Sequence, residues 1–409
     1  MGSTPAQHLQ TLKGSSKPKV GIAWQGGGNH GAFSWGVSRI LLPEFERRGI
    51  PVVGMVGASA GAKNAVYAGY GMAVGKDGHK AELADLMMER LWFSVAMLAV
   101  PVRTGLSLKN LSNPATVIPE MMLNTSHMMR NVGDTMIAMG SMFNVLGQRK
   151  DSQKAMLEAY ARIPGVEFAS LYQRHGMPTL PTFDEHPLQH LVNEHVDFKK
   201  LSASTAPKVI VNTTNLRTGG LNVYMGKSLT SEAVASSGTL PELFNALSIG
   251  DSKHWDGGFS ANPPIQPLYD ECPEMTDLIL IRVTPQHMRV GGMPHDHAAM
   301  ADRRMEVMLN AAVESELRWA QKHAEDTGRQ LNIHVVSVPD VWPHAMSTKT
   351  DFECTNWQFF KQLRDAGEVA AEVWLNRHGH DLGQRSTYDH DYRVYGGTAN
   401  KHANRLQNV

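Results

Sequence analysis

The sequence lacks the features that would place it outside the ordinary globular proteins. Only two of its 409 residues are cysteines, Cys272 and Cys354, without CxxC spacing, so we expect reduced thiols rather than a disulfide framework. It also lacks an excess of either charge, because 39 basic residues balance 39 acidic ones. This balance gives no support to nucleic-acid binding or to a disordered acidic tail.

Long hydrophobic runs are missing as well. The longest, over residues 91–102, is interrupted by Ser94 and Pro101 and is much shorter than the ~20 residues that cross a bilayer. The polar segment 1–18 has no apolar stretch of signal-peptide length. We therefore expect a cytoplasmic protein, with any contact to a membrane or lipid surface being peripheral.

The apolar pattern near the N-terminus predicts alternating strands and helices. Short apolar runs at Val20–Trp24 and residues 52–58 indicate buried strands, and helical spacing follows each, over residues 33–48 and 60–72. Gly49 is the expected end of the first helix. Successive β-α-β units of this kind are right-handed and place their strands in parallel. The sequence therefore predicts an α/β fold with a mostly parallel sheet.

Further along the chain, the sheet pattern is interrupted and then resumes. Residues 76–200 predict a helical insertion, and later apolar runs predict strands at 209–213, 221–224, 278–283 and 333–338. A helix is expected over 302–326, capped by Asp302. The residues expected near its buried side are Met305, Met308, Leu309, Ala312, Leu317 and Trp319. We divide the chain into a flexible tail (1–18), one α/β domain (19–385) and a polar arm (386–409).

The predicted insertion is unusually rich in methionine. A soft apolar surface of this kind suits a lid or acyl-chain wall above an active site, and it equally suits a helical core. Trp92, Phe93 and Met97 add apolar area that fits either role. The methionines concerned are Met121, Met122, Met128, Met129, Met136, Met139 and Met142.

A candidate nucleophile lies between the second strand and its helix. The residues from Gly57 to Gly61 form the pattern G-x-S-x-G, with Ser59 at its centre. In this pattern the serine occupies a strained turn, so its neighbours must be small for strand and helix to approach, and all four are Gly or Ala. At the N-terminus of a helix, the dipole also favours developing negative charge. We interpret Ser59 as catalytic rather than as part of a structural turn.

A glycine-rich loop follows the first strand, from Gly26 to Gly31, with the sequence G-G-G-N-H-G. It fits the dinucleotide fingerprint, but that fingerprint requires an acidic residue at the end of the second strand, and none lies between Glu46 and Asp77. Without G-K-[ST], a P-loop is excluded too. Consecutive glycines instead suit an oxyanion hole, with the amides of Gly27 and Gly28 as donors.

The third motif is Asp256-Gly257-Gly258, far downstream. Alone it indicates only a turn. Together, the glycine loop, G-x-S-x-G and D-G-G occur in the order found in patatin-like phospholipases, and the chain resembles that family over about residues 20–283. A similar tail near residues 357–382 suggests a bacterial-type member.

The resemblance implies a three-layer α/β/α fold and a lipid acyl hydrolase. Ser59 would form an acyl intermediate and Asp256 would be its base, without a metal or cofactor. The implied partner is a lipid or acyl-ester substrate, and homo-oligomerisation stays open. His254, two residues before Asp256, is the alternative base of a Ser-His-Asp triad. The family usually carries Arg or Lys where this chain has His30. A histidine is mostly neutral at pH 7, so the resemblance supports ester hydrolysis more strongly than it supports a phosphate-bearing substrate.

Two other functions remain open from the sequence. One is an acyl-lipid-binding or regulatory protein that kept the fold without turnover. The other is a nucleotide-dependent enzyme that uses the glycine loop, which tight NAD or ATP binding would support.

Overall fold

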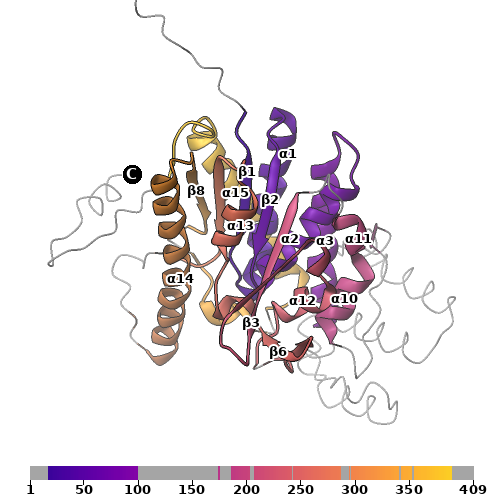
Figure 1. Ribbon diagram of the computed structural model, residues 1–409. Coiled ribbons are helices and arrows are strands. Elements are labelled where there is room, and N and C mark those ends of the chain that lie inside the picture. The colour runs from indigo at the N-terminus through magenta and orange to yellow at the C-terminus, as the bar shows by residue number, and fades with distance from the viewer. Residues whose placement is uncertain are drawn as a thin grey trace, which may run out of the picture.

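The computed structural model describes residues 17–99, 174–175, 186–202, 207–241, 243–286, 294, 296–339, 342–351 and 354–388 (Figure 1). The predicted methionine-rich surface, residues 121–142, lies outside the described residues, as does most of the predicted 76–200 insertion. Nearly all of the predicted tail and arm lie outside them as well.

The described residues contain an eight-stranded sheet with the order β5-β6-β3-β2-β1-β7-β8, and β4 pairs with β3. Five neighbouring strands are parallel, which confirms the prediction of a mostly parallel sheet: β3 (Lys208–Asn215), β2 (Val52–Gly57), β1 (Val20–Trp24), β7 (Asp277–Arg282) and β8 (Asn332–Ser337). The antiparallel strands gather at the β3 end: β4 (Leu221–Met225), β5 (Leu247–Ile249) and β6 (Ser252–Trp255).

Helices cover both faces of the sheet, so the fold has the three layers expected (Figure 1). Successive strand residues point to opposite faces: Ile22 and Trp24 join one core, and Ala23 joins the other. The first core also contains residues of α1 (Gly31–Arg48), α2 (Ala60–Val74), α3 (Lys80–Leu98) and α15 (Trp357–His378). The second contains residues of α13 (Ile265–Glu271) and α14 (His297–Thr327).

The remaining described elements are short. Three helices lie between α3 and β5: α10 (Pro187–His195), α11 (Phe198–Leu201) and α12 (Ser231–Ser236). Four single 3₁₀ turns complete the set: η1 (Gly28–His30), η2 (Gly226–Ser228), η3 (Gly257–Phe259) and η4 (Met346–Lys349). None of the described helices is both long enough and apolar enough to cross a membrane.

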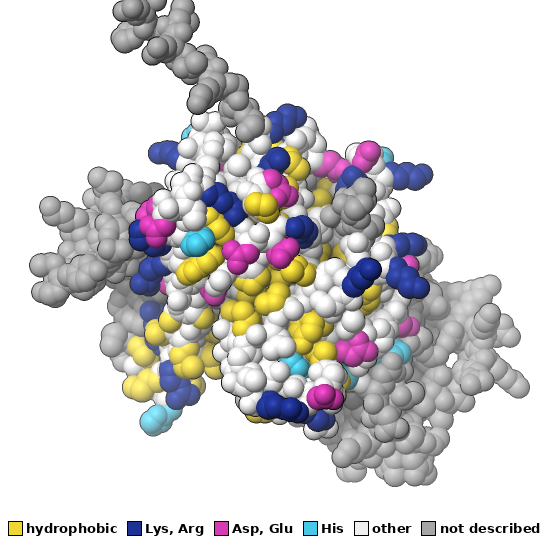
Figure 2. Space-filling model, viewed as in Figure 1, with side chains coloured by type: hydrophobic (Ala, Val, Ile, Leu, Met, Phe, Trp, Pro, Cys, Tyr) yellow, Lys and Arg dark blue, Asp and Glu magenta, His cyan; other side chains and the backbone are white. Residues whose placement is uncertain are grey.

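The predicted cap of α14 is wrong, and so is the first half of its predicted buried face, whereas Leu317 is buried and Trp319 packs against the second core as expected. Asp296 caps the helix by accepting a hydrogen bond from the Ala299 amide, whereas Asp302 accepts from the amides of Met346 and Ser347 in η4. The buried positions begin only at Asn310, so Met305 and Met308 are 46% and 60% exposed. Figure 2 shows hydrophobic side chains at the surface over the lower part of α14. Only the second half of this long helix packs on the sheet, where the buried residues are Asn310, Val313, Leu317, Ala320 and Ala324.

Helix α15 packs closely against α1. Gly36 of α1 faces the carbonyl of Arg364, and Gly367 of α15 faces the carbonyl of Phe33. At either glycine an added Cβ would lie 2.0 Å or less from the facing oxygen. The two helix backbones therefore touch without an intervening side chain.

Trp92, Phe93 and Met97 of α3 belong to the core, because each is at most 5% exposed. The Trp92 ring packs edge-on against Phe360 of α15, with ring centroids 5.0 Å apart. Its indole N–H donates to Asn64 Oδ1 at 3.1 Å. Of the two roles expected for these three residues, the core interpretation is the one that the structure supports.

Candidate active site

Ser59 occupies the sharp turn between β2 and α2. Its backbone has φ 55° and ψ −124°, and among the described residues it is the only one other than glycine with a positive φ. Such a conformation is strained for a residue with a side chain and persists only where the surroundings enforce it. Gly57 and Gly61 permit the turn, since a Cβ on Gly57 would lie 2.2 Å from the Gly61 carbonyl. Ser59 itself is partly exposed.

The strained turn is held by Ser237, which follows α12. The Ser59 amide donates to Ser237 Oγ at 3.0 Å, and the Ser59 carbonyl accepts from the Ala62 amide at 3.1 Å. No sequence pattern indicates the Ser237 contact, because the two serines are 178 positions apart.

The glycine loop lies directly beside Ser59. A Cβ on Gly26 would lie 2.8 Å from the Ser59 Cβ. The Gly26 amide donates to Asn262 Oδ1 at 2.6 Å, and Asn262 Nδ2 donates back to the Gly26 carbonyl at 3.3 Å. Gly27 and Gly28 follow, partly exposed, and their amides donate no hydrogen bond to another described residue.

Asp256 is buried, with 3% of its surface exposed, at the turn between β6 and η3. Its Oδ1 accepts from the Gly258 amide at 2.7 Å, and its carbonyl accepts from Thr214 Oγ1 at 2.8 Å. A second anchor comes from Asn212 of β3, whose Nδ2 donates to the Gly257 carbonyl at 2.8 Å. These hydrogen bonds fix the D-G-G motif to β3.

The three motifs meet through two shared supports. Ser237 binds the Ser59 amide through its hydroxyl, and its carbonyl accepts from the Gly257 amide at 3.2 Å. Asn262 holds Gly26 and also lies near Gly258, where an added Cβ would be 3.6 Å from Asn262 Cγ. The fold therefore gathers the glycine loop, the serine turn and the aspartate turn at the carboxyl ends of β1 and β2 and beside β6.

Lys63 is a charged residue of this site that the sequence analysis missed. It lies one turn after Ser59 in α2, is 6% exposed, and its Nζ donates to the Ser59 carbonyl at 3.4 Å. Burial lowers the pKa of Lys63 to about 8, against the attraction of the Asp256 carboxylate, which raises it. Its ammonium therefore stays mostly charged at neutral pH and faces Asp256. In the sequence, Lys63 is the one charged residue among the small residues that follow Ser59, and this position could have marked it as part of the site.

The histidine predicted as an alternative base lies elsewhere. His254 is buried in β6, where its Nδ1 is 2.8 Å from Thr213 Oγ1. His186, which the sequence analysis did not single out, is closer to the site, with Nε2 3.3 Å from Thr239 Oγ1. Burial, reinforced by Lys63, lowers the pKa of His186 to about 4, so its ring is neutral at pH 7.

His30 is also neutral and fully buried. Burial is the main cause that holds its pKa well below the usual value, and the nearby charge of Lys349 adds to it. Its Nε2 lies 2.7 Å from Thr348 Oγ1 in η4. His30 therefore supplies no fixed positive charge to the glycine loop. In the part of the chain that the structure describes, no three potential ligands gather as a metal site would require.

A serine on a strained strand-to-helix turn at the edge of a parallel sheet is the arrangement of the α/β serine hydrolases. A sequence model of the patatin-like phospholipase family matches residues 22–269, more than half of the chain. The chain therefore belongs to the patatin-like phospholipase family, whose members act on lipid substrates.

One similar solved structure is VipD from Legionella pneumophila, with 15% sequence identity and a TM-score of 0.34. The similarity covers 89% of this chain and 68% of that one. A comparison with curated protein sequences finds no match. The family assignment accordingly depends on the family model.

Proposed function

We propose that this protein hydrolyses fatty acyl esters through a Ser59–Asp256 dyad. The observation that carries the proposal is the convergence of three distant motifs on the strained Ser59 turn, through Ser237 and Asn262. Membership of a family of lipid acyl hydrolases supports the reaction class. The intact motifs favour turnover over a silent lipid-binding role.

In the proposed reaction, Ser59 Oγ attacks the ester carbonyl while Asp256 takes the hydroxyl proton. The Gly27 and Gly28 amides, which donate to no other described residue, stabilise the oxyanion. Collapse of this intermediate breaks the ester bond, and Asp256 returns the proton to the leaving alcohol. Water then attacks the acyl-serine, with Asp256 again as base, and releases the fatty acid. Hydrolysis of a lipid ester also implies peripheral contact with a lipid surface.

Labelling by a fluorophosphonate probe tests the nucleophile. Wild-type protein should be labelled and Ser59→Ala should not, because the probe phosphonylates only an activated serine. Mass spectrometry of the adduct checks the site, and circular dichroism checks that the variant is folded. The control is Ser228→Ala, in the exposed turn η2, which should label like wild type.

Undiminished labelling of folded Ser59→Ala would overturn the proposal. Folded wild-type protein that neither reacts with the probe nor hydrolyses acyl esters of any chain length would favour the lipid-binding alternative.

The support of the turn can be tested separately with Ser237→Ala. Loss of the hydroxyl leaves the Ser59 amide without its acceptor, at a cost of about 1–3 kcal/mol, so we expect turnover to fall roughly tenfold in a folded protein. Initial rates of p-nitrophenyl ester hydrolysis measure this. The adjacent Ser236 is equally buried, and its Oγ has no hydrogen-bond partner among the described residues, which makes Ser236→Ala the matched control. Equal rates in the two variants would contradict the proposed support.

A further inference from the structure

Lys349 places a buried ammonium group behind the glycine loop. It ends η4, which lies beyond the residues matched by the family model, and only 6% of its surface is exposed. Its Nζ donates to Thr284 Oγ1 at 2.8 Å, the one hydrogen bond that this ammonium makes to a described residue. An ammonium has three N–H donors, and this bond uses one of them.

The ammonium lies against Gly27 of the candidate site, and the Lys349 carbonyl lies against Gly28, 2.0 Å from the position of an added Cβ. A Cβ on Gly27 would lie 3.2 Å from Lys349 Nζ and 3.3 Å from its Cε, whereas a Cβ on Gly26 would point to Ser59. These two directions place the loop between the nucleophile and the ammonium. The Val283 side chain contacts the same face of Gly27, with its Cγ2 2.7 Å from the position of the added Cβ.

The η4 turn is also hydrogen-bonded to Asn29 and His30, the residues of the glycine loop that follow Gly28. Asn29 Nδ2 donates to the carbonyls of Thr348 and Asp351, at 2.9 and 3.0 Å, and His30 Nε2 contacts Thr348 Oγ1. Asp302 of α14 holds the start of the turn by accepting from the amides of Met346 and Ser347. The position of Lys349 is therefore set from both sides.

Burying a charged amine costs desolvation free energy, so a residue that only filled space here would be better without a charge. Burial lowers the pKa of Lys349 to about 7, and the attraction of Glu306 in α14 opposes that shift. Among the described residues, His30 of η1 also faces Lys349, and His344, before η4, lies beside His30; burial lowers the pKa values of both histidines. A methionine would fill similar space without the cost of burying a charge.

We propose that Lys349 is a positioning residue of the oxyanion loop. Its ammonium fixes the Gly27 backbone and, from behind the loop, stabilises the oxyanion that the Gly27 and Gly28 amides bind. A lysine far along the chain thereby supplies the cation that neutral His30 does not. This role rests on the proposed ester hydrolysis at Ser59.

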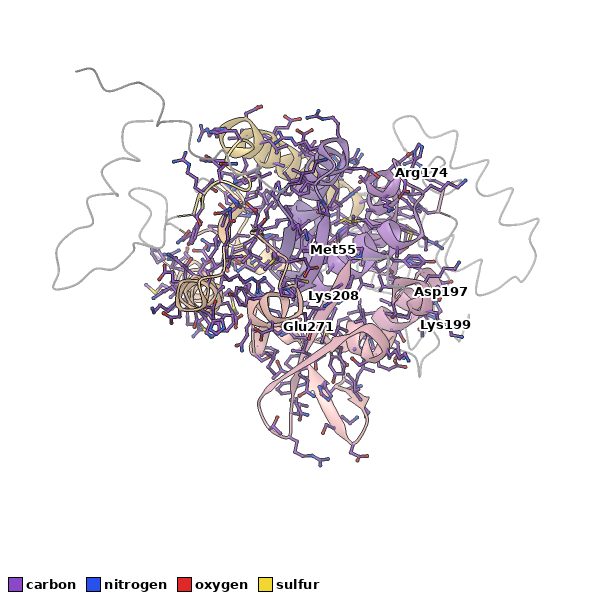
Figure 3. The ribbon with its side chains drawn as sticks, turned by 45° about the horizontal axis from the view of Figure 1, so that its top comes forward. Met55, Arg174, Asp197, Lys199, Lys208 and Glu271 are labelled. Carbon is purple, nitrogen blue, oxygen red and sulfur yellow. The ribbon has the colours of Figure 1, made fainter. Side chains whose placement is uncertain are left out.

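Lys349→Met is the principal test, since it keeps most of the side-chain volume and removes the charge. We expect kcat for a p-nitrophenyl ester to fall tenfold or more, with KM changed less than threefold, because the charge acts on the transition state. Lys349→Arg should recover part of the rate. The control is Lys208→Met, which removes an exposed amine at the first residue of β3, away from the carboxyl ends of the strands. Figure 3 shows Lys208 beside Glu271.

Two further readouts separate this role from a structural one. An alkylboronic acid forms a tetrahedral anion on an active serine, so Lys349→Met should weaken n-butylboronic acid inhibition about tenfold. Wild-type kcat should also fall as pH rises through about 7, because the ammonium loses its proton there, and the variant should lack this decrease. A decrease common to both proteins would instead come from Lys63 or another group.

The possible failures are distinguishable. If wild-type protein shows neither labelling nor turnover, the proposed function fails. If wild-type protein is active and folded Lys349→Met matches it in kcat and boronate affinity, the role of Lys349 is wrong. Should Lys349→Met not fold, Lys349→Gln, which keeps a polar end group, is measured in the same way.

Discussion

Asp256→Asn should lower ester turnover by roughly 10²–10⁴-fold, the usual contribution of a general base. The amide has the same shape and can still accept the hydrogen bond from the Gly258 amide through its oxygen. It cannot take the proton of Ser59, and it also removes the negative charge that faces Lys63. The fold should therefore persist while the nucleophile loses its activation.

Steady-state rates with a p-nitrophenyl ester, together with the rate of fluorophosphonate labelling, measure this effect. The control is Asp251→Asn, at the exposed turn between β5 and β6, which should keep the wild-type rate. If Asp256→Asn retains turnover within a few-fold of wild type, Asp256 is not the base. His186, whose pKa is affected by Lys63, would then be the next residue to replace.

Gly367→Ala should lower the free energy of unfolding by about 2 kcal/mol. The added Cβ would lie 2.0 Å from the Phe33 carbonyl, so α15 and α1 would have to separate. Overpacking of this severity costs about 3 kcal/mol, and the better helix propensity of alanine returns about 1 kcal/mol. Backbone atoms have no alternative rotamer with which to relieve the contact.

Urea denaturation followed by circular dichroism checks this value. Val369 lies two positions further along α15 with 60% of its surface exposed, so Val369→Ala should change stability by less than ~0.5 kcal/mol. A Gly367→Ala protein as stable as wild type would show that the helices tolerate a wider separation.

The first elements of the fold could be predicted from the sequence because their signals are local. The observed β1 has the expected bounds, and Gly49 ends α1 in the left-handed conformation expected of a C-terminal glycine. The register of α14 could not be predicted, because apolar residues occur along its whole length. Which half of the helix meets the sheet depends on where β7 and β8 place it.

In the candidate site, the motifs are local in the sequence, whereas the residues that hold them together are distant. Ser59 and its small neighbours form a local pattern, so the strained turn could be anticipated. The contacts of Ser237 and Asn262 join residues 178 and 236 positions apart, and no spacing rule reports them. Lys349 could not be predicted as a site residue, because only the folded structure brings it against Gly27.

The family match ends at residue 269, yet the folded unit does not. β7 pairs with β1 at the centre of the sheet, and α15 covers α1. An expression fragment cut at the end of the match would leave the β1 edge unpaired and the face of α1 that α15 covers open to water, conditions that promote aggregation. Recombinant fragments should therefore extend through residue 388, and insoluble shorter fragments should not be taken as evidence of an inactive protein.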